Sequence, residues 1–351
     1  SAETTYHYRV TATDPSGNAG SSTDLTFTTE AAPSATAIDL WYGSNQSFGS
    51  PVRTQERINI VGSLSDPESV TSLSYSVNGG AVRYLGIGPD NRRLAEPGDF
   101  NADIPYADLS TGTNAVAITA EGPGGASTTE TVTVTVAPDG SLPLPFTTDW
   151  TANQPLQEQA HSVDGIWQAG NGTVRTVQLG YDRILALGDQ AWTDYEITVP
   201  MTLHDFGPGA GQYLSGAAMI GVGLRWQGHT QVQNEQPAYG WYPAGGYSWY
   251  RFYDNGPRWE MFGNHNSPAE RGRRNAIDFD PGDTYLMRVR VESLPGGGAT
   301  YSMRMWEDGT PEPTTWMGTI IDEDSPPNGS IVLIAHHVDA TFGDVTVTPV
   351  P

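Results

Sequence analysis

Apolar and polar residues alternate in short runs along almost the whole chain. Tyr6, Tyr8 and Val10 alternate near its start, and residues 284–293 (TYLMRVRVES) repeat the pattern late in the sequence. Strict alternation is typical of strands that are buried on one face, and no amphipathic helical pattern extends beyond a turn or two. The runs are separated by turn residues, among them 41 Gly and 26 Pro. The pattern predicts an all-β protein.

The first two predicted parts of the chain are small. Residues 1–30 contain two alternating runs around a turn at 14–18, which predicts a hairpin. After a Pro/Ala/Ser-rich linker, residues 38–136 contain six short runs and predict a small sandwich. The dipeptide Asn78-Gly79 within it is a strong signal for a two-residue hairpin turn.

The third predicted part, residues 146–349, follows a second linker rich in Pro and Gly at 137–145. It contains twelve runs with strand character. So many strands in one unit predict two packed sheets, and a jelly-roll sandwich is the expected architecture.

The first two parts resemble modules of bacterial secreted proteins. TTYHYRVTATDPSGN and LTFTT in residues 1–30 resemble the last two strands of a fibronectin type III domain. INIVGSLSDPESVTSLSYSVNGG in residues 38–136 is similar to immunoglobulin-like modules, which serve as spacers or contact platforms. These resemblances imply a partial fibronectin type III hairpin, an immunoglobulin-like β-sandwich and a longer parent protein.

The third part resembles the concanavalin A-like, laminin-G-like sandwiches of bacterial extracellular proteins. The residues that carry the resemblance are Asp194-Tyr195-Glu196, GVGLRW, Tyr285, YSMRMWE, EPTTW and GSIVLIAHHVDATFGDVTVTP. It implies a concanavalin A-like jelly-roll fold. These motifs are mostly structural, so they indicate a fold better than an activity.

The composition narrows the classes of partner. All 17 basic residues are Arg, and with 40 acidic residues the net charge is −23. This sign opposes nucleic acids and anionic membranes, which require basic surfaces. The chain has no Cys, hence no disulfides, and no apolar run approaches the roughly 18 residues of a membrane span. We expect an extracellular or cell-surface protein that neither binds nucleic acid nor inserts into a membrane.

One segment, residues 225–266, combines aromatic rings with hydrogen-bonding side chains. Eleven of its first 38 residues are Trp, Tyr or Phe, with Arg and His scattered among them. Aromatic faces suit the C–H faces of a sugar ring, and Arg, His and Asn suit its hydroxyl rim. The same rings are equally suited to fill a sandwich core. The residues expected to bind a polysaccharide or other glycan are Arg225, Trp241, Tyr242, Trp249, Tyr250, Arg251, Trp259 and His265.

Two alternatives to a carbohydrate-binding or adhesive module remain open. A polysaccharide-cleaving enzyme is one, although no strand carries the paired carboxylates of a retaining glycosidase. A lyase remains possible through a basic and phenolic set comprising His204, Arg225, Tyr250, Arg251, Tyr253 and His265. The other alternative is a structural or filament protein, in which the N-terminal hairpin mediates self-association by adding strands to a neighbour.

Other polar residues suggest structural roles. A structural Ca²⁺ is expected where the first and last strands of the third part meet, with Asp149 and Asp344 as ligands. Asp99 to Asp103 resembles the start of a calcium loop but lacks its later Gly and Glu, so Asn101 and Asp103 are expected on the solvent face of a strand. Arg92 and Arg93 are expected in a loop held by acidic neighbours. His336 and His337 are expected to face opposite sides of a strand.

Overall fold

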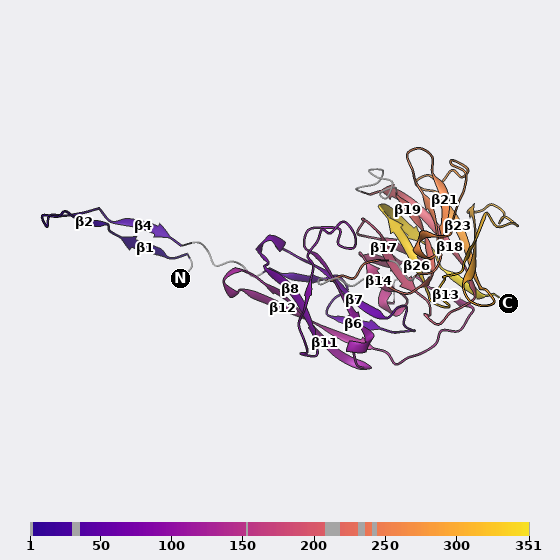
Figure 1. Cartoon of the computed structure of the whole chain (residues 1–351), viewed down its shortest axis with the longest axis horizontal. Helices are drawn as coiled ribbons and strands as arrows, with labels where there is room; N and C mark the ends of the chain where they lie inside the picture. The colour runs from indigo at the N-terminus through magenta and orange to yellow at the C-terminus, as the bar shows by residue number, and fades with distance from the viewer. Residues whose placement is uncertain are drawn as a thin grey trace.

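The structure of this chain, a computed structural model, describes residues 3–29, 36–151, 154–207, 218–230, 236–240 and 244–350. Apart from five single-turn 3₁₀ segments, every helix or strand in these ranges is a β-strand. The prediction of an all-β protein is therefore confirmed. The strands form an N-terminal hairpin and two sandwiches, which follow one another in chain order (Figure 1). In the part of the chain that is described, no helix is long and apolar enough to cross a membrane.

The N-terminal hairpin is formed by two successive antiparallel pairs. β1 (Thr5–Tyr8) pairs with β4 (Leu25–Thr28), and β2 (Thr11–Thr13) pairs with β3 (Ala19–Ser21). The predicted turn is present, because the Asp14 N–H donates to the Asn18 carbonyl at 2.9 Å. Every residue of the four strands is exposed, including Tyr6 and Phe27, whose rings stack at 5.3 Å.

The smaller sandwich consists of two sheets between residues 36 and 136. Its sheet of three strands contains β5 (Ile38–Leu40), β7 (Arg57–Leu64) and β10 (Asp99–Pro105). Its sheet of five contains β6 (Asn45–Phe48), β8 (Ser72–Val77), β9 (Arg83–Leu85), β11 (Gly112–Glu121) and β12 (Ser127–Val136). Apolar side chains from both sheets, such as Ile60 and Val132, form one core. At the predicted turn between β8 and β9, Asn78 and Gly79 have φ of 51° and 72°, the left-handed values that this turn requires.

Strand β10 differs from its predicted environment. Asn101 and Asp103 were expected to face solvent, yet each is only 2% exposed. The difference has a physical cause. The alternation of apolar and polar residues shows which side chains face the core of their own sandwich. The side chains of Asn101 and Asp103 point away from that core, but they are covered by the larger sandwich. Their polar groups are satisfied there, as the next section describes.

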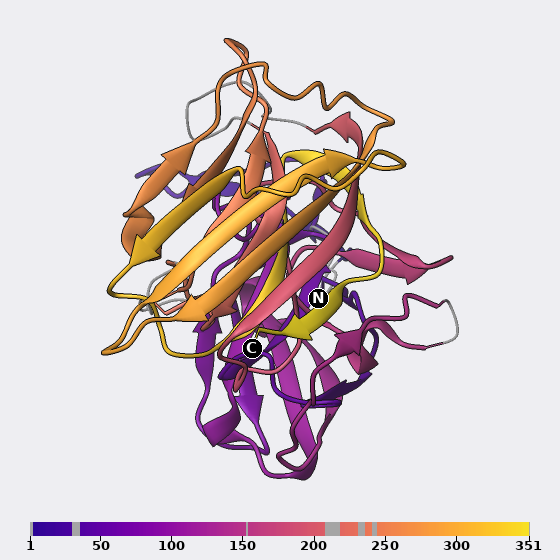
Figure 2. The same cartoon turned by 90° about the vertical axis from the view of Figure 1, so that its right-hand side faces the viewer.

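The larger sandwich spans residues 146–350 and has a sheet of nine strands, part of which crosses the front of Figure 2. These strands are β13 (Phe146–Thr147), β15 (Trp167–Gly170), β16 (Thr173–Thr176), β18 (Tyr195–Phe206), β23 (Thr284–Ser293), β24 (Ala299–Glu307), β25 (Gly318–Asp322), β27 (Val338–Phe342) and β28 (Thr346–Pro349). The first strand pairs with the last, since Phe146 lies opposite Val347.

The second sheet of the larger sandwich has seven strands in the order β14-β17-β26-β19-β20-β21-β22. Their bounds are β14 (His161–Asp164), β17 (Arg183–Leu187), β19 (Met219–Trp226), β20 (Tyr247–Arg251), β21 (Arg258–Phe262), β22 (Ala269–Arg271) and β26 (Ser330–His336). Side chains such as Val222 and Tyr250 pack against Val199 and Met287 of the nine-stranded sheet to form the main core. The two-sheet architecture agrees with the prediction.

Four strands of the larger sandwich were not predicted, namely β14, β15, β22 and β27. Strand β14 explains why. Its sequence is HSVD, and all four side chains are buried. It therefore shows no alternation, and its polar residues suggest a loop.

Candidate functional site

One face of the seven-stranded sheet is turned away from the main core, and we call it the outer face. Because side chains alternate along each strand, Tyr250 and Trp259 point into the core while their neighbours point outward. The pairing register places one outward row across four strands, formed by Gly221, Trp249, Glu260 and Arg271. The adjacent rows add two pairs, Arg251 with Arg258 and Tyr247 with Phe262.

Three aromatic rings lie side by side on this face. The Trp249 ring centroid is 5.8 Å from that of Tyr247, with nearly parallel planes, and 5.1 Å from that of Phe262. Strand β20 passes so close to Gly221 that a Cβ there would lie 2.5 Å from the Trp249 Cα. The rings are largely buried, with 3% of Tyr247, 7% of Phe262 and 8% of Trp249 exposed.

Glu260, on β21 beside the edge strand β22, is a fully buried carboxylate on the outer face. The Trp249 Nε1–H donates to it at 3.2 Å, the Tyr253 hydroxyl lies 3.2 Å away, and the Arg258 Nε–H donates at 2.9 Å. An ionised carboxylate without partners is costly to bury, so these donors are needed to keep it there. Glu260 thereby fixes the orientation of the side chains around it.

Positive charge gathers around this carboxylate. We call Arg251, Arg258, Arg271 and Arg274 the arginine cluster. Three of its members approach Glu260, at 3.9, 2.8 and 3.4 Å for Arg251, Arg258 and Arg271. The side chain of Arg271 is 45% exposed, and its guanidinium lies 4.9 Å from the centre of the Phe262 ring. The outer face thus carries guanidinium groups that both contact aromatic rings and reach solvent.

Tyr253 lies at the edge of the cluster. Three guanidinium groups surround its half-buried ring at 5.2–5.3 Å from the centroid, those of Arg251, Arg258 and Arg274. Tyr253 also lines a cavity of about 400 Å³ whose other walls include Phe206, Phe252, Phe279, Asp254, Asp278 and Asp280. The cavity therefore has an aromatic wall and an acidic wall, and it adjoins a basic surface.

A buried polar network joins the other end of the outer face to the smaller sandwich. Arg93 donates from Nη1 to Asp103 at 2.7 Å and from Nε to Asp164 of β14 at 2.6 Å. His229 contacts the second Asp164 oxygen at 2.9 Å. Burial raises the pKa of Asp164, but the charges of Arg93 and His229 outweigh this effect and hold the pKa at about 2. The prediction that acidic neighbours hold Arg93 is confirmed.

Asparagine side chains extend this network. Asn101 donates to the Val163 carbonyl at 2.8 Å, and Asn59 donates to the Asn101 side chain at 2.8 Å. The Asn59 backbone N–H donates to Nε2 of His161 in β14 at 3.1 Å. These bonds satisfy the polar groups of β7 and β10 that face the larger sandwich.

The network also anchors residues 236–240, which precede β20. Gln236 forms an isolated parallel bridge with Leu85 of β9, and its side-chain oxygen accepts from the Asp103 N–H at 2.9 Å. The Arg92 guanidinium lies 4.5 Å from the centre of the Tyr239 ring. The smaller sandwich therefore positions part of the aromatic segment of the larger one.

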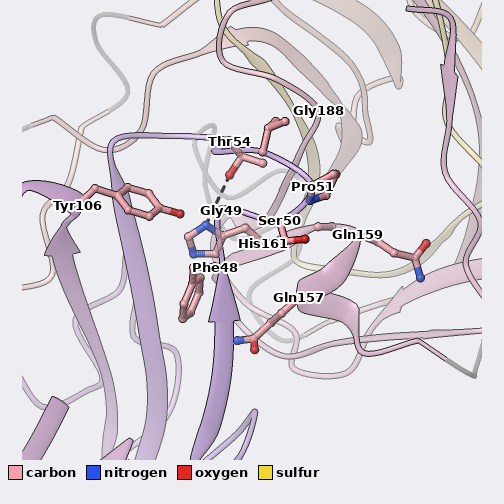
Figure 3. Close-up of a pocket in the computed structure, with 12 residues that line it drawn as sticks. Phe48, Gly49, Ser50, Pro51, Thr54, Tyr106, Gln157, Gln159, His161 and Gly188 are labelled. Carbon is pink, nitrogen blue, oxygen red and sulfur yellow. Dashed lines mark hydrogen bonds between the residues drawn. The ribbon is translucent and has the colours of Figure 1, made fainter. Parts of the chain in front are cut away.

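A small pocket lies within this interface, with room for about 10 Å³ (Figure 3). Thr54, Phe48 and Tyr106 line it from the smaller sandwich, and His161 and Gly188 from the larger. Burial lowers the pKa of His161 to about 4. Its Nε2 accepts a hydrogen bond, so the neutral ring carries its proton on Nδ1, the atom facing Thr54. The volume holds one water at most, so this pocket is not a ligand site.

The structure separates the predicted ligand-binding residues. Trp249 and Arg251 lie on the outer face, whereas Tyr250 and Trp259 belong to the main core. The Tyr250 hydroxyl donates to the Ile277 carbonyl at 2.6 Å, so its polar end is also satisfied internally. Trp241 and Tyr242 lie outside the described residues.

Arg225 occupies a structural position. It is the extra residue of a bulge in β19, has φ of 57° and is fully buried. Its guanidinium donates to the carbonyls of Pro326 and Thr193 and to the Ser293 hydroxyl, at 2.6, 3.0 and 2.7 Å. These contacts fasten the loops at one end of the sandwich and leave the guanidinium inaccessible to a ligand.

His265 is exposed and lies in the segment between β21 and β22, with φ of 56°. His336 and His337 differ from their prediction. The left-handed conformation of His337 (φ 53°) breaks the alternation, so both rings pack edge-on against Tyr181. His336 is buried with its Nδ1 at 2.7 Å from Asp182, which makes a structural role the better description.

The predicted calcium ligands do not form a metal site. Asp149 and Asp344 are exposed and flank β13 and β28 rather than lying within them. One Asp344 oxygen already accepts from the Trp150 N–H at 3.3 Å and faces the Thr148 hydroxyl. Among the described residues, no three His, Asp or Glu side chains come together in a way that could hold a metal ion. Asp149 and Asp344 by themselves therefore do not make up a calcium site in the described part of the chain.

Sequence reasoning missed Glu260, Arg258, Arg271 and Arg274 as members of one cluster. A signal was available, because five of the 17 Arg residues fall between positions 251 and 274. Their assembly depends on the register of β20, β21 and β22, which alternation alone does not specify.

Comparisons with known proteins give only distant likenesses. No protein-family profile and no curated protein sequence matches this chain. Among solved structures, the carbohydrate binding module CBM66 from Bacillus subtilis is 14% identical and matches 54% of this chain and 95% of its own, with a TM-score of 0.33. The VIP36 exoplasmic/lumenal domain bound to Ca²⁺ and Man3GlcNAc is 12% identical over 60% of this chain and 91% of its own, with a TM-score of 0.38.

The alginate lyase Aly36B is 12% identical, and the match covers 60% of this chain and 98% of the lyase chain, with a TM-score of 0.38. Likenesses of this strength do not assign the chain to a family or give it a ligand.

Proposed function

We propose that this chain is an extracellular glycan-binding module of a larger secreted protein and that it binds polysaccharide at the outer face of the seven-stranded sheet. The observation that carries the proposal is the arginine cluster, which surrounds Glu260 and contacts the rings of Tyr253 and Phe262. Guanidinium groups held in place by aromatic rings can donate several hydrogen bonds to sugar oxygens at little entropic cost.

The burial of each side chain decides whether it supports the site or contacts the sugar. Tyr247, Trp249 and Phe262 are too buried to stack broadly on sugar, so they form the support beneath the site. The accessible surface comes from Tyr253 and the arginine cluster. The cavity beside Tyr253, at about 400 Å³, provides a concave apolar surface next to these donors.

The test is native affinity electrophoresis of the whole chain through gels that contain single polysaccharides. At least one polymer is expected to slow the protein, and Tyr253→Ala should weaken that retardation. Tyr84→Ala is the matched control, because Tyr84 is 59% exposed and belongs to the smaller sandwich. Absence of retardation in every gel would reject glycan binding.

Cleavage of a polysaccharide is a second candidate. It is favoured by the Tyr253 hydroxyl, which lies 3.2 Å from a buried carboxylate and is surrounded by guanidinium groups. Such a phenol could exchange a proton with a substrate whose negative charge the arginines neutralise. Incubation of the chain with a retained polymer tests this candidate. New ultraviolet-absorbing unsaturated ends would support cleavage, and an unchanged polymer would mean that the chain binds the polymer without cleaving it.

A further inference from the structure

We propose that the ligand is an acidic polysaccharide and that the arginine cluster binds its sugar carboxylates. This inference rests on the proposed function and specifies its substrate class. Three guanidinium groups, those of Arg251, Arg258 and Arg271, lie within 4 Å of one carboxylate, Glu260, and the fourth, that of Arg274, lies 5.3 Å from the centre of the Tyr253 ring, so positive groups outnumber the carboxylate that they surround. One cation neutralises one carboxylate, so Arg258 at 2.8 Å suffices for Glu260, and the exposed Arg271 adds a positive charge that the ion pair does not require.

Nearby acidic residues leave much of this excess in place. Glu270 is engaged on the other side of β22, where its carboxylate accepts from the Thr319 N–H at 2.6 Å. Asp254, Asp278 and Asp280 line the adjoining cavity. An anionic group is therefore repelled from the cavity and attracted to the cluster, so the two surfaces suit different parts of one sugar chain.

The cluster is also built for contact with a ligand. The exposed fraction of the side chain rises outward, from 14% for Arg251 and 19% for Arg258 to 45% for Arg271. The innermost groups are oriented by Glu260, and the outermost lies over Phe262. A planar guanidinium matches a planar carboxylate through two parallel hydrogen bonds. A polymer with a carboxylate on each sugar could engage several of these groups at once.

The net charge of −23 does not exclude an anionic ligand. At physiological ionic strength the charges of a protein are screened beyond about 8 Å. A carboxylate at the outer face therefore responds mainly to the arginine cluster and its immediate neighbours. The remaining acidic surface would weaken non-specific binding of polyanions elsewhere on the chain.

The experiment compares polymers that differ only in charge. Polygalacturonate and alginate are each embedded in affinity gels beside an esterified form of the same polymer, with neutral glucans and mannans as further arms. At least one acidic polymer is expected to bind the whole chain about tenfold or more tightly than its ester, as expected for loss of a charge-assisted hydrogen bond.

The outcomes separate the two claims. Equal binding of acid and ester, or binding of neutral polymers alone, would overturn the acidic ligand while keeping glycan binding. No binding to any polymer would overturn the proposed function itself, and the acidic ligand with it.

Variants locate the contact. Arg271→Gln removes the positive charge but keeps a polar side chain at an exposed position, so the fold should be preserved, and affinity for the acidic polymer should fall about tenfold. Affinity for the ester should not change. Arg175→Gln is the matched control, because Arg175 is 50% exposed and paired with Asp339 at the nine-stranded sheet. If both variants bind the acidic polymer equally well, the cluster is not the site.

Discussion

Arg93 of the smaller sandwich donates a hydrogen bond from Nε to Asp164 of the larger sandwich at 2.6 Å, and both side chains are almost completely buried. The same guanidinium pairs with Asp103 of β10 at 2.7 Å. One buried cation therefore neutralises carboxylates from two sandwiches. The interface is part of the folded structure rather than a flexible joint.

Arg93→Ala is expected to destabilise the chain strongly. Removing one partner of a buried ion pair leaves unpaired charges in a low-dielectric environment, at a cost of about 3–5 kcal/mol. The measurement is the free energy of unfolding in urea. Arg175→Ala, which breaks an exposed pair, should cost less than about 1 kcal/mol. Similar losses for the two variants would show that the interface contributes little.

The isolated larger sandwich is expected to be less stable than the same sandwich in the whole chain. A fragment of residues 141–351 lacks Arg93 and Asn101, so Asp164 keeps His229 but loses its ion pair with Arg93, and the Val163 carbonyl loses the hydrogen bond from Asn101. Differential scanning calorimetry of the fragment and the whole chain provides the comparison. A fragment that melts at the temperature of the whole chain would contradict the interface described above.

Stability is expected to fall as the pH drops from 6.5 to 4. Burial lowers the pKa of His161 to about 4 from its ordinary value of 6.5, so the unfolded chain binds a proton in this range and the folded chain does not. The negative charges of Asp103 and Asp164 raise the pKa of His161, but they do not outweigh burial, and the positive charge of Arg93 lowers this pKa further. The loss reaches about 3 kcal/mol below pH 4.

Urea unfolding between pH 4 and 8 measures this dependence. His161→Gln removes the titrating group and should flatten the profile in this window. Protonation of Asp164 lowers the stability at more acidic pH, between its ordinary pKa of 3.8 and its folded-state pKa of about 2, so it produces a separate loss of stability. A wild-type profile without slope between pH 4 and 6.5 would mean that His161 is not held neutral.

Trp249→Ala is expected to unfold the outer face rather than only to weaken a ligand contact. The ring is 8% exposed and packs between Tyr247 and Phe262. Its truncation leaves a cavity that costs about 3–5 kcal/mol and removes a donor from buried Glu260. A loss below 1 kcal/mol in urea unfolding would place Trp249 at the surface after all. Tyr253→Ala should have the smaller effect, because that ring is only half buried.

Deletion of residues 1–29 is expected to leave the unfolding temperature of the two sandwiches unchanged. Every residue of β1 to β4 is exposed, so the hairpin buries little apolar surface. Thermal unfolding followed by circular dichroism compares the two forms. Light scattering of the whole chain also tests whether Tyr6 and Phe27 mediate self-association. A mass that does not depend on concentration would count against it.

Strands such as β18 and β23 could be predicted from alternation because each has one face in a core and one nearer solvent. Strands β17, β19 and β26 are buried on both faces and are indicated instead by short apolar runs. Alternation also separates Trp249 from Tyr250, since neighbours on a strand must face opposite sides. It does not say which of the two faces the main core. That choice depends on the sheet that covers β20, a relationship between residues far apart in the chain.

The interface between the sandwiches was beyond sequence reasoning for a related reason. Asn101 and Asp103 are polar and alternate with apolar residues, so they read as a solvent face. Asn101 is covered by β14 and Asp103 by residues 236–240, and β14 itself carries no alternation. Arg225 was misjudged because a bulge, which shifts the register of β19, turns its guanidinium inward.

The buried bond between Arg93 and Asp164 also bears on how tension passes through the molecule. If a glycan is held at the outer face while the chain is pulled from its N-terminus, the force enters the smaller sandwich before the larger. Two routes then act in parallel, the covalent one through residues 137–145 and the non-covalent one through the buried network. Because the second route must shear many short hydrogen bonds together, the two sandwiches should resist separation under load and keep the binding face oriented toward its polymer.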